Sequence, residues 1–369
     1  MKSIRVSITS SPYNVIIGQG TLAQAGKQII SVLGRRPAKC CVITAQPIWK
    51  HWGKVLEASL KNAGLNAFVL KIPDGERHKN LHEVEKLLVG MAKHGADRTS
   101  IVIALGGGVV CDMAGFAASI YMRGIPVVQL PSTLLAQVDA AIGGKTGVDL
   151  KPGKNLAGSF HQPHLVIEDT ETLRTLPQRE YRAGLFEVIK CGIIRDPRLF
   201  QVLEDERKAI LARKQDPVQH IIEASVKVKA DVVSADEREG DLRRVLNFGH
   251  TIGHAIEAAT GYKQLLHGEA VAWGMIAAIQ ISCRMKTLNN ELATLMTDQI
   301  KSYGPLPAIR VRREHIISFL ASDKKNVAGV PHFILLAGVC STVVRNDVPM
   351  SLIREVIDSL LTHSKISNK

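Results

Sequence analysis

Apolar and polar positions follow two different patterns along this chain, and the change falls near residue 175. In the first part, short apolar runs alternate with longer segments in which apolar residues recur every three to four positions. Such an alternation of strands and helices is typical of a parallel sheet covered by helices. The alternating stretch Met1–Ile17 predicts a further strand. The runs that predict strands are 39–44, 67–70, 100–105 and 127–130, and the helical segments are 48–62, 81–94 and a short helix from Val109.

After Pro177 the helical period dominates. The chain has 369 residues, which is long for one hydrophobic core, so we expect two domains with bounds 1–176 and 177–369. The first is an α/β domain and the second is mostly α-helical, and a cleft between two domains is a common place for an active site. The predicted helices of the second domain are 180–191, 199–213, 217–233, 250–259, 268–284 and 291–302.

The net charge of +13, from 47 Lys and Arg against 34 Asp and Glu, is compatible with nucleic acid, an anionic membrane or an acidic small molecule as partner. The basic residues form no dense block and aromatic residues make up only 4%, which disfavours nucleic acid. No apolar run is long enough to span a bilayer, and no signal-peptide core follows Met1. The six cysteines include no C-x-x-C pair, as expected in a reducing compartment. We therefore expect a cytoplasmic protein that binds an anionic small molecule.

Three histidines within eighteen residues suggest a metal site. His250 and His254 are four residues apart, so on a helix both side chains lie on one face, and His267 can join them from the next element. Imidazole and carboxylate are common ligands of zinc and similar ions. A zinc peptidase is disfavoured because Thr251 stands where the zincin motif has its glutamate. Hydrogen-bonded core histidines on a buried helix are the alternative explanation of the same pattern.

A glycine triplet, Gly106–Gly108, follows a predicted strand and opens a predicted helix. Backbone N–H groups at such a helix N-terminus can hold a phosphate or pyrophosphate group. The dinucleotide motif G-x-G-x-x-G would need glycine at position 111, where this chain has Cys111, and an ordinary tight turn explains the triplet equally well. Asp112, in the first helical turn, is a candidate ribose or nicotinamide contact or a partner of the helix dipole.

Further charged residues stand in glycine-rich or apolar surroundings. Lys145 lies in the segment Gly143–Gly147, whose flexible backbone can bring its amine to an anionic ligand, although the Walker spacing is absent. Glu187 stands among apolar residues with Lys190 three positions later, and is either half of an intrahelical pair or the carboxylate ligand that the histidines lack. A lone loop arginine such as Arg123 is as a rule a solvated cation. Upstream of the histidines, three residues add hydrogen-bond donors for carboxylate or phosphate groups: Lys229, Arg243 and Asn247.

Taken together and in this order, the motifs closely resemble those of the 3-dehydroquinate synthase family. The resemblance implies a Rossmann-like NAD domain, an α-helical metal domain, an active site in the cleft between them and, as a rule, a homodimer. It also implies the second step of the shikimate pathway, in which 3-deoxy-D-arabino-heptulosonate 7-phosphate becomes 3-dehydroquinate and phosphate. This reaction proceeds by transient oxidation with NAD, β-elimination of phosphate, reduction and intramolecular aldol closure. The matching segments are 106–112, 134–139, 143–147, 182–190, 247–254, 267–269 and 323–325.

The resemblance also implies roles for individual residues that match the family's motifs. Glu187, His250 and His267 correspond to the ligands of a divalent metal, zinc or cobalt, whereas His254 corresponds to a residue that contacts substrate. The other members of the substrate-binding and catalytic set are Arg123, Asp139, Lys145, Lys154, Asn155, Lys190, Lys229, Arg243, Asn247 and one of the pair Lys324 and Lys325. The positions that correspond to NAD contacts are Glu76, Lys79, Gly107, Gly108, Val109, Asp112, Ser132, Thr133, Lys145, Lys154 and Thr175.

Two positions depart from the family pattern, since Cys111 replaces a glycine of the glycine-rich turn and Ala141 stands where a serine is common. Both residues are small, so the departures bear on NAD affinity more than on the fold. Two other activities stay open. A related cyclase such as 2-deoxy-scyllo-inosose synthase accepts a substrate without the carboxylate, which Arg243 and Asn247 argue against. A metal-dependent polyol dehydrogenase would give net NADH, which the lysine-rich substrate set argues against.

Overall fold

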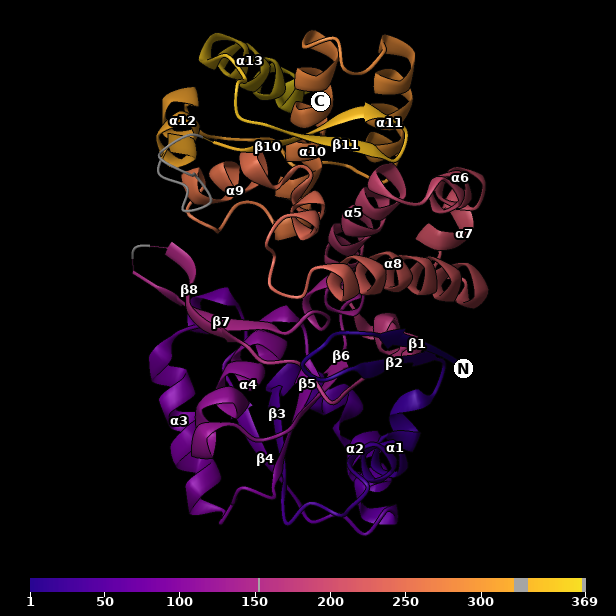
Figure 1. Cartoon of the computed structure of the whole chain (residues 1–369), viewed down its shortest axis with the longest axis vertical. Coiled ribbons are helices and arrows are strands. Elements are labelled where there is room, and N and C mark those ends of the chain that lie inside the picture. The colour runs from indigo at the N-terminus through magenta and orange to yellow at the C-terminus, as the bar shows by residue number, and fades with distance from the viewer. Residues whose placement is uncertain (152, 322–330, 367–369) are drawn as a thin grey trace. The chain divides into compact units, whose positions relative to one another are not determined.

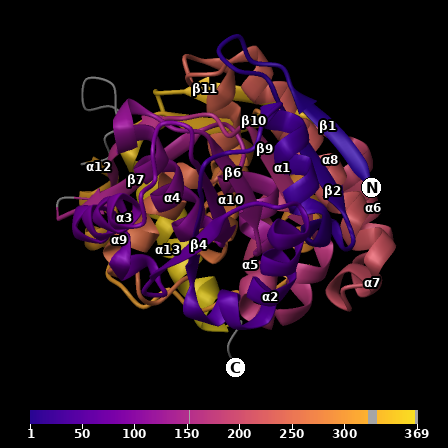
Figure 2. The ribbon, with the colours of Figure 1, turned by 90° about the horizontal axis from the view of Figure 1, so that it is seen from below.

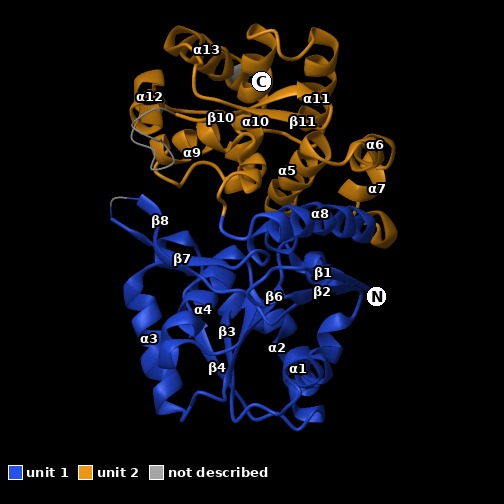
Figure 3. Ribbon diagram, viewed as in Figure 1, with its two compact units in different colours: residues 1–177, 218–238 blue, residues 178–217, 239–369 orange. Residues whose placement is uncertain are grey.

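The structure is a computed structural model that describes residues 1–151, 153–321 and 331–366, so that Lys324 and Lys325 lie outside the described residues. The chain forms two compact units (Figure 3). Unit 1 comprises Met1–Pro177 and Val218–Arg238, and unit 2 comprises Gln178–Pro217 and Glu239–Lys369. The chain therefore does not divide at a single point, because most of helix α8 (Gln215–Ala235) returns to unit 1.

Unit 1 is built on a seven-stranded sheet in the order β1-β2-β9-β6-β5-β3-β4 (Figure 1). β1 is antiparallel to β2, and the other neighbouring strands of this sheet are parallel, which confirms the predicted α/β class. The alternating amino-terminal stretch forms two strands joined by a turn instead of one. The strands are β1 (Lys2–Val6), β2 (Tyr13–Gly18), β3 (Cys40–Ala45), β4 (Ala67–Ile72), β5 (Ile101–Gly106), β6 (Val127–Pro131) and β9 (Leu165–Asp169).

Helices cover both faces of this sheet, which explains why its central strands β3, β5 and β6 are buried along their whole length (Figure 2). In β3, Cys41 and Ile43 pack with α3 and α4, whereas Cys40 and Val42 pack with α1 and α2 on the other face. Neighbouring residues of a strand point to opposite faces, so a strand buried on both sides shows no alternation. The helices are α1 (Ala25–Leu33), α2 (Gln46–Asn62), α3 (Leu81–Lys93) and α4 (Gly108–Ile120).

The order of the parallel strands places the glycine triplet at an edge suited to ligands. Numbered along the chain, β3, β4, β5, β6 and β9 are arranged 2-1-3-4-5, one of the common doubly wound orders. The direction of winding reverses between β3 and β5, and such sheets bind ligands outside the carboxyl ends of the strands at that point. β5 ends at Gly106, the first glycine of the triplet.

Several smaller elements of unit 1 were not expected from the periodicity. The glycine-rich segment after residue 143 forms an antiparallel hairpin, β7 (Lys145–Leu150) with β8 (Gly153–Phe160). A Cβ on Gly158 would lie 2.1 Å from the backbone oxygen of Thr146, so glycine permits the close approach of the two strands. The short helical turns are η1 (Thr21–Gln24), η2 (Glu76–His78), η3 (Tyr121–Arg123), the π-helical η4 (Ala136–Ala140) and η5 (Thr170–Thr175).

Glu168, in β9, is fully buried in the core of unit 1. Neither carboxylate oxygen has a hydrogen-bond partner among the described residues, and burial raises the pKa of this carboxyl well above its usual value. The fold therefore holds this proton more tightly than the unfolded chain does. The contribution of Glu168 to stability is full below its unfolded pKa of about 4.5 and is lost as pH rises from there through its raised folded pKa.

We expect Glu168→Gln to remove this pH dependence, because the amide carries no charge at any pH. The difference in unfolding free energy between variant and wild type should grow with pH by up to about 1.4 kcal/mol per unit. Urea denaturation at several pH values measures it, with Glu171→Gln, a more exposed carboxylate in η5, as the control. Parallel pH profiles for Glu168→Gln and wild type would contradict the expectation.

Unit 2 is mostly helical, as expected, and its described residues include a two-stranded sheet of β10 (Phe333–Gly338) and β11 (Ser341–Arg345) that the periodicity did not reveal. The expected single helix over 199–213 is wrong, since the chain breaks at Glu206 between α6 and α7. The helices are α5 (Gln178–Ile194), α6 (Pro197–Asp205), α7 (Arg207–Leu211), η6 (Leu242–Asn247), α9 (His250–Ala259), α10 (His267–Arg284), α11 (Asn290–Ser302), α12 (Arg313–Ala321) and α13 (Met350–Ile366).

Two expectations from composition can be compared with the described residues. Among them, no helix combines the length and the apolar character that crossing a membrane requires. All six cysteines are free thiols. Burial raises the pKa of Cys40 to about 12, so this thiol is protonated at neutral pH and is a poor nucleophile.

Candidate functional site

Three helices of unit 2 carry the predicted metal ligands. Glu187 lies in the middle of α5, His250 is the first residue of α9 and His267 is the first residue of α10. These helices approach closely because glycines face backbone: a Cβ on Gly268 would lie 1.9 Å from Ala183 O. Likewise, a Cβ on Gly274 of α10 would lie 1.8 Å from the backbone oxygen that precedes α9. Any larger residue at either glycine would push the helices, and with them the histidines, apart.

The carboxylate of Glu187 is the centre of this group. Its Oε1 lies 3.6 Å from His250 Nε2 and 3.7 Å from His267 Nε2. Oε1 is buried and accepts no hydrogen bond among the described residues, whereas Oε2 forms an ion pair with Lys190. A buried carboxylate oxygen without a hydrogen bond is costly, which indicates that a cation completes the site.

The donor set fits a divalent metal ion. Metal–nitrogen and metal–oxygen bonds to zinc are about 2.0–2.2 Å, so tetrahedral neighbours are separated by about 3.4 Å. The separations of 3.6 and 3.7 Å at Glu187 are close to this value, and longer than ordinary hydrogen bonds. Three protein ligands would leave a position open for substrate, as in catalytic zinc sites.

His254 lies next to the same group, one helical turn after His250. Its ring centroid is 5.1 Å from that of His250 and 5.7 Å from that of His267. The ligand atoms of the three histidines all lie within 4.8 Å of one another. The distances alone thus allow His254 as a ligand as well, and its assignment to substrate stays a prediction.

Two groups that contact the Nδ1 atoms of the imidazoles were not identified in the sequence analysis. His250 Nδ1 lies 3.1 Å from the backbone oxygen of Phe248, and His267 Nδ1 lies 3.0 Å from Glu257 Oε2. Glu257 could have been found from spacing, because it stands seven residues after His250 and three after His254, on one face of α9. Its significance, however, depends on contact with His267 of the next helix.

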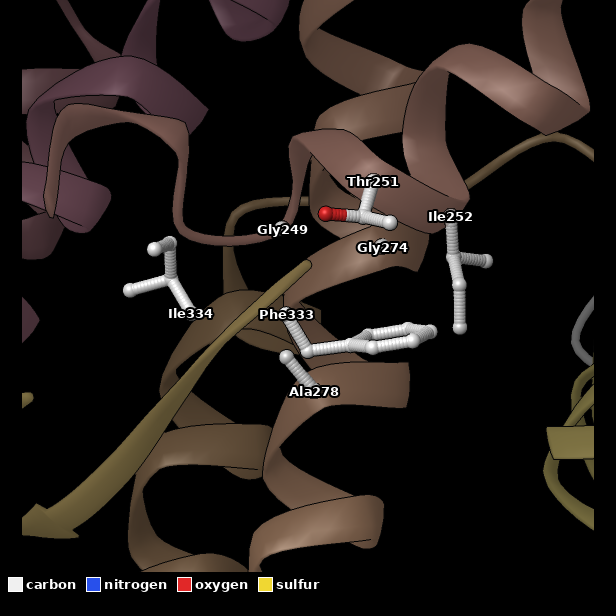
Figure 4. Close-up of a pocket in the computed structure, with 7 residues that line it drawn as sticks. All are labelled: Gly249, Thr251, Ile252, Gly274, Ala278, Phe333 and Ile334. Atoms are coloured by element: carbon white, nitrogen blue, oxygen red, sulfur yellow. The ribbon is translucent and has the colours of Figure 1, made fainter. Parts of the chain in front are cut away.

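The segment before α9 carries two further predicted residues. Arg243, in η6, is only 2% exposed, and Asn247 donates a hydrogen bond from Nδ2 to Glu239 Oε1 at 2.9 Å. A small cavity lies beside the start of α9 (Figure 4). Its walls carry no titratable side chain, so it is a packing gap and not part of the metal group. The residues that line it are Gly249, Thr251, Ile252, Gly274, Ala278, Phe333 and Ile334.

In unit 1 the glycine triplet forms the N-terminus of α4, with Gly107 as the N-cap. A Cβ on Gly106 would lie 2.5 Å from Val110, and one on Gly107 would lie 3.0 Å from Thr133 Cγ2. The first amides of α4 have no partner within the helix and can donate to an anion. Cys111 does not obstruct this edge, because its buried side chain turns inward and its Sγ lies 3.8 Å from Gly106 O.

Lys79 links several of the predicted cofactor residues. Its Nζ lies 2.5 Å from Asp112 Oδ2 and 2.6 Å from Asn155 Oδ1. Burial by itself lowers the pKa of Lys79, but the charges of Asp112 and Glu76 outweigh it, and the pKa is raised. Lys79 therefore stays a cation. Beside it, Lys154 Nζ lies 3.0 Å from Glu76 Oε1, so these two predicted residues are also brought together.

A second ion pair joins α8 to η4. Lys229 Nζ lies 2.5 Å from both the backbone oxygen and Oδ1 of Asp139. The side chain of Lys229 is 7% exposed and that of Asp139 is 30% exposed, so the pair is only partly buried. The return of α8 to unit 1 thus brings a predicted site residue at position 229 to one at position 139.

The remaining predicted residues of unit 1 are more scattered. Ser132 donates its backbone N–H to Gly106 O at 2.8 Å, which holds it beside the triplet. Thr175 instead accepts a hydrogen bond from Trp52 of α2. Lys145, at the start of β7, and Arg123, in η3, have exposed side chains. Val109 is the second residue of α4, beside the triplet.

Comparison with known proteins places these features in one family. The family model described as 3-dehydroquinate synthase N-terminal matches residues 69–183, and the one described as 3-dehydroquinate synthase C-terminal matches residues 184–326. A 3-dehydroquinate synthase of Solibacter usitatus (strain Ellin6076) is 50% identical over 362 residues, which cover 98% of this chain and 100% of the relative.

Solved structures with 26% identity have the same fold. A 2-deoxy-scyllo-inosose synthase, solved with carbaglucose-6-phosphate, NAD+ and Co2+, superposes with a TM-score of 0.88 over 98% of this chain and 100% of its own. A 2-epi-5-epi-valiolone synthase from Streptomyces hygroscopicus subsp. jinggangensis 5008, solved with NAD+ and Zn2+, also has a TM-score of 0.88, over 97% of this chain and 99% of its own. The likeness thus extends over both units.

Proposed function

The chain belongs to the 3-dehydroquinate synthase family, and from this premise we propose that it converts 3-deoxy-D-arabino-heptulosonate 7-phosphate to 3-dehydroquinate and phosphate. NAD is held by unit 1, and a divalent metal is held by Glu187, His250 and His267 of unit 2. The observation that carries the metal site is the buried Glu187 Oε1, which faces two imidazole Nε2 atoms at 3.6 and 3.7 Å. When bound, NAD supplies a reversible hydride acceptor and the metal a Lewis acid for the substrate's C5 alcohol.

Residues of unit 1 hold the pyrophosphate of NAD and orient the side chains around the cofactor. The amides that open α4 are free to bind the pyrophosphate, and Gly107 and Gly108 let the ligand approach the backbone. Asp112, paired with the cationic Lys79, offers its carboxylate to the ribose or nicotinamide end. The same lysine holds Asn155 and thereby orients the β7–β8 hairpin, which carries Lys145 and Lys154.

The substrate bears a carboxylate and a phosphate, and cationic side chains suited to both are present. Lys190, Lys229 and Arg243 are buried, so their charges act in surroundings that exclude water and strengthen attraction to an anion. Exposed cations such as Arg123 and Lys145 add to the attraction. When the substrate's phosphate group is held firmly, that group can itself accept the proton that is removed during elimination. The chain therefore needs groups that position the phosphate more than it needs a strong base. His254, beside the metal ligands, is assigned to hold the phosphate or to move a proton.

Two rival activities share this architecture. For a cyclase of the 2-deoxy-scyllo-inosose synthase type, identity is 26%, against 50% for a 3-dehydroquinate synthase. The buried Arg243 also favours a substrate with a carboxylate. A polyol dehydrogenase would release NADH, and its uncharged substrate would offer no anionic group to the buried cations Lys190, Lys229 and Arg243. A homodimer and a location in the cytoplasm stay predictions from the sequence.

The assay that tests the proposed function combines the protein, the heptulosonate phosphate, Zn2+ or Co2+ and a catalytic amount of NAD+. We expect stoichiometric phosphate release while absorbance at the NADH wavelength stays constant, because hydride returns to the substrate in each turnover. Protein stripped with a chelator is the control and should release no phosphate until metal is added back. NADH that accumulates with a polyol such as glycerol would instead establish a dehydrogenase, and phosphate release from glucose 6-phosphate would point to the other cyclase.

A further inference from the structure

The two imidazoles that face Glu187 are held from behind by different groups. His250 Nδ1 lies 3.1 Å from a backbone oxygen, that of Phe248, whereas His267 Nδ1 lies 3.0 Å from the side chain of Glu257. Glu257 is 3% exposed. The second histidine is therefore backed by a buried carboxylate, which places a negative charge on the side of the ring away from Glu187.

A carboxylate at Nδ1 affects an imidazole in two ways. It accepts the Nδ1 hydrogen, so that Nε2 keeps its lone pair free, and it prevents the ring from rotating about the Cβ–Cγ bond. Its charge also makes Nε2 a better electron donor to a cation. At His250 the backbone oxygen provides the orientation but no full charge. The side chain of His267 is also more exposed, at 29% against 10% for His250, so its ring has more need of such a partner.

We infer that Glu257 is a positioning residue of the metal site, which acts through His267 and sets the affinity for the ion. The inference rests on the proposed function, because it takes His267 as a metal ligand. Glu257 itself contacts the far nitrogen of that ring and not the atoms that face Glu187. Its removal therefore leaves all three ligands in the chain and weakens one of them.

The measurement is the dissociation constant for Zn2+, obtained by competition with a chelating dye, with the visible spectrum of the Co2+-loaded protein as a second readout. We expect Glu257→Ala to weaken Zn2+ binding by about ten- to hundredfold, the usual cost of losing such a partner. Glu257→Gln keeps a hydrogen-bond acceptor without the charge, so its loss should be smaller. The conservative variant also keeps the test informative if the alanine variant does not fold.

A double-mutant cycle separates this role from a structural one. In a His267→Ala background, Glu257→Ala should cause no further loss of Zn2+ affinity, because the ring through which it acts is gone. Equal losses in both backgrounds would mean that Glu257 supports the fold of α9 in general, and would overturn the inference. Thr260→Ala is the matched control: its hydroxyl bonds the backbone oxygens of Ile256 and Glu257 without touching the carboxylate. This control should bind Zn2+ as the wild type does.

The outcomes also distinguish this inference from the proposed function. A wild-type protein that does not bind Zn2+ or Co2+ would remove the premise that His267 is a ligand. A wild-type protein that binds tightly, with Glu257→Ala equally tight, would overturn the role of Glu257 and leave the proposed function intact.

Discussion

His267→Ala protein is expected to lose its bound metal, and Glu187→Ala protein likewise, because each lacks one of the three proposed ligands. A structural zinc ion contributes about 10–16 kcal/mol through four ligands, so one ligand accounts for roughly 3 kcal/mol, or about a hundredfold in affinity. Elemental analysis after equilibration in a chelator-buffered Zn2+ solution measures the loss. Phosphate release from the heptulosonate phosphate should fall in parallel.

His254→Ala is the control that separates the ligands from their neighbour. We expect it to keep its metal while turnover falls, since the family pattern assigns this histidine to substrate. Loss of metal in this variant would show that the proximity of the three imidazoles, within 4.8 Å, reflects a site with all three as ligands. Retained metal in both His267→Ala and Glu187→Ala would refute the assignment of the site altogether.

Lys190→Ala should strongly destabilise the metal-free protein. Lys190 and Glu187 form an ion pair in which each side chain is 2% exposed. Removing one partner of such a buried pair leaves an uncompensated charge and costs about 3–5 kcal/mol. A divalent cation beside Glu187 can compensate that charge, so added Zn2+ should recover much of the loss. Urea denaturation with and without Zn2+ gives both quantities.

Lys86→Ala provides a matched comparison for this effect. Lys86 pairs with Glu83 at the same helical spacing of three residues, but its side chain is 56% exposed. Exposed pairs of this kind contribute about 0.2–1 kcal/mol, so a small change that does not respond to Zn2+ is expected. If Lys190→Ala were as mild as Lys86→Ala, or if Zn2+ did not restore its stability, Glu187 would not be the charged centre of a metal site.

Much of unit 1 could be predicted because its signals are local. The apolar runs at β3, β5 and β6 and the glycines before α4 are readable within a few residues. The β7–β8 hairpin was missed because its glycines, which suggest a flexible loop, serve the close approach of two strands. The strand β9 and the β10–β11 hairpin were also missed, although 165–167 and 333–337 are short apolar runs of the kind that predicted strands elsewhere.

The candidate site was predicted in part. Spacing identified His250, His254 and His267, but it favoured the pair four residues apart as ligands. The apolar surroundings of Glu187 left it as either a metal ligand or half of an ion pair with Lys190, and the family pattern was needed to choose between them. In the structure, Glu187 Oε1 faces the Nε2 atoms of His250 and His267, and Glu257 lies behind His267. No spacing rule relates position 187 to position 250, because the two residues are on different helices.

The sequence by itself determined the family, the α/β and helical halves and the kinds of side chain in the site, because these follow from local periodicity and from motifs in a given order. Only the tertiary structure decided which of those side chains meet: the convergence of α5, α9 and α10 on one buried carboxylate, the pair of Lys229 with Asp139, and the support of His267 by Glu257. The physical reason is that these contacts depend on how separate elements pack, as where Gly268 and Gly274 let α10 approach α5 and the start of α9. Contacts between residues so far apart in the chain leave no period in the sequence.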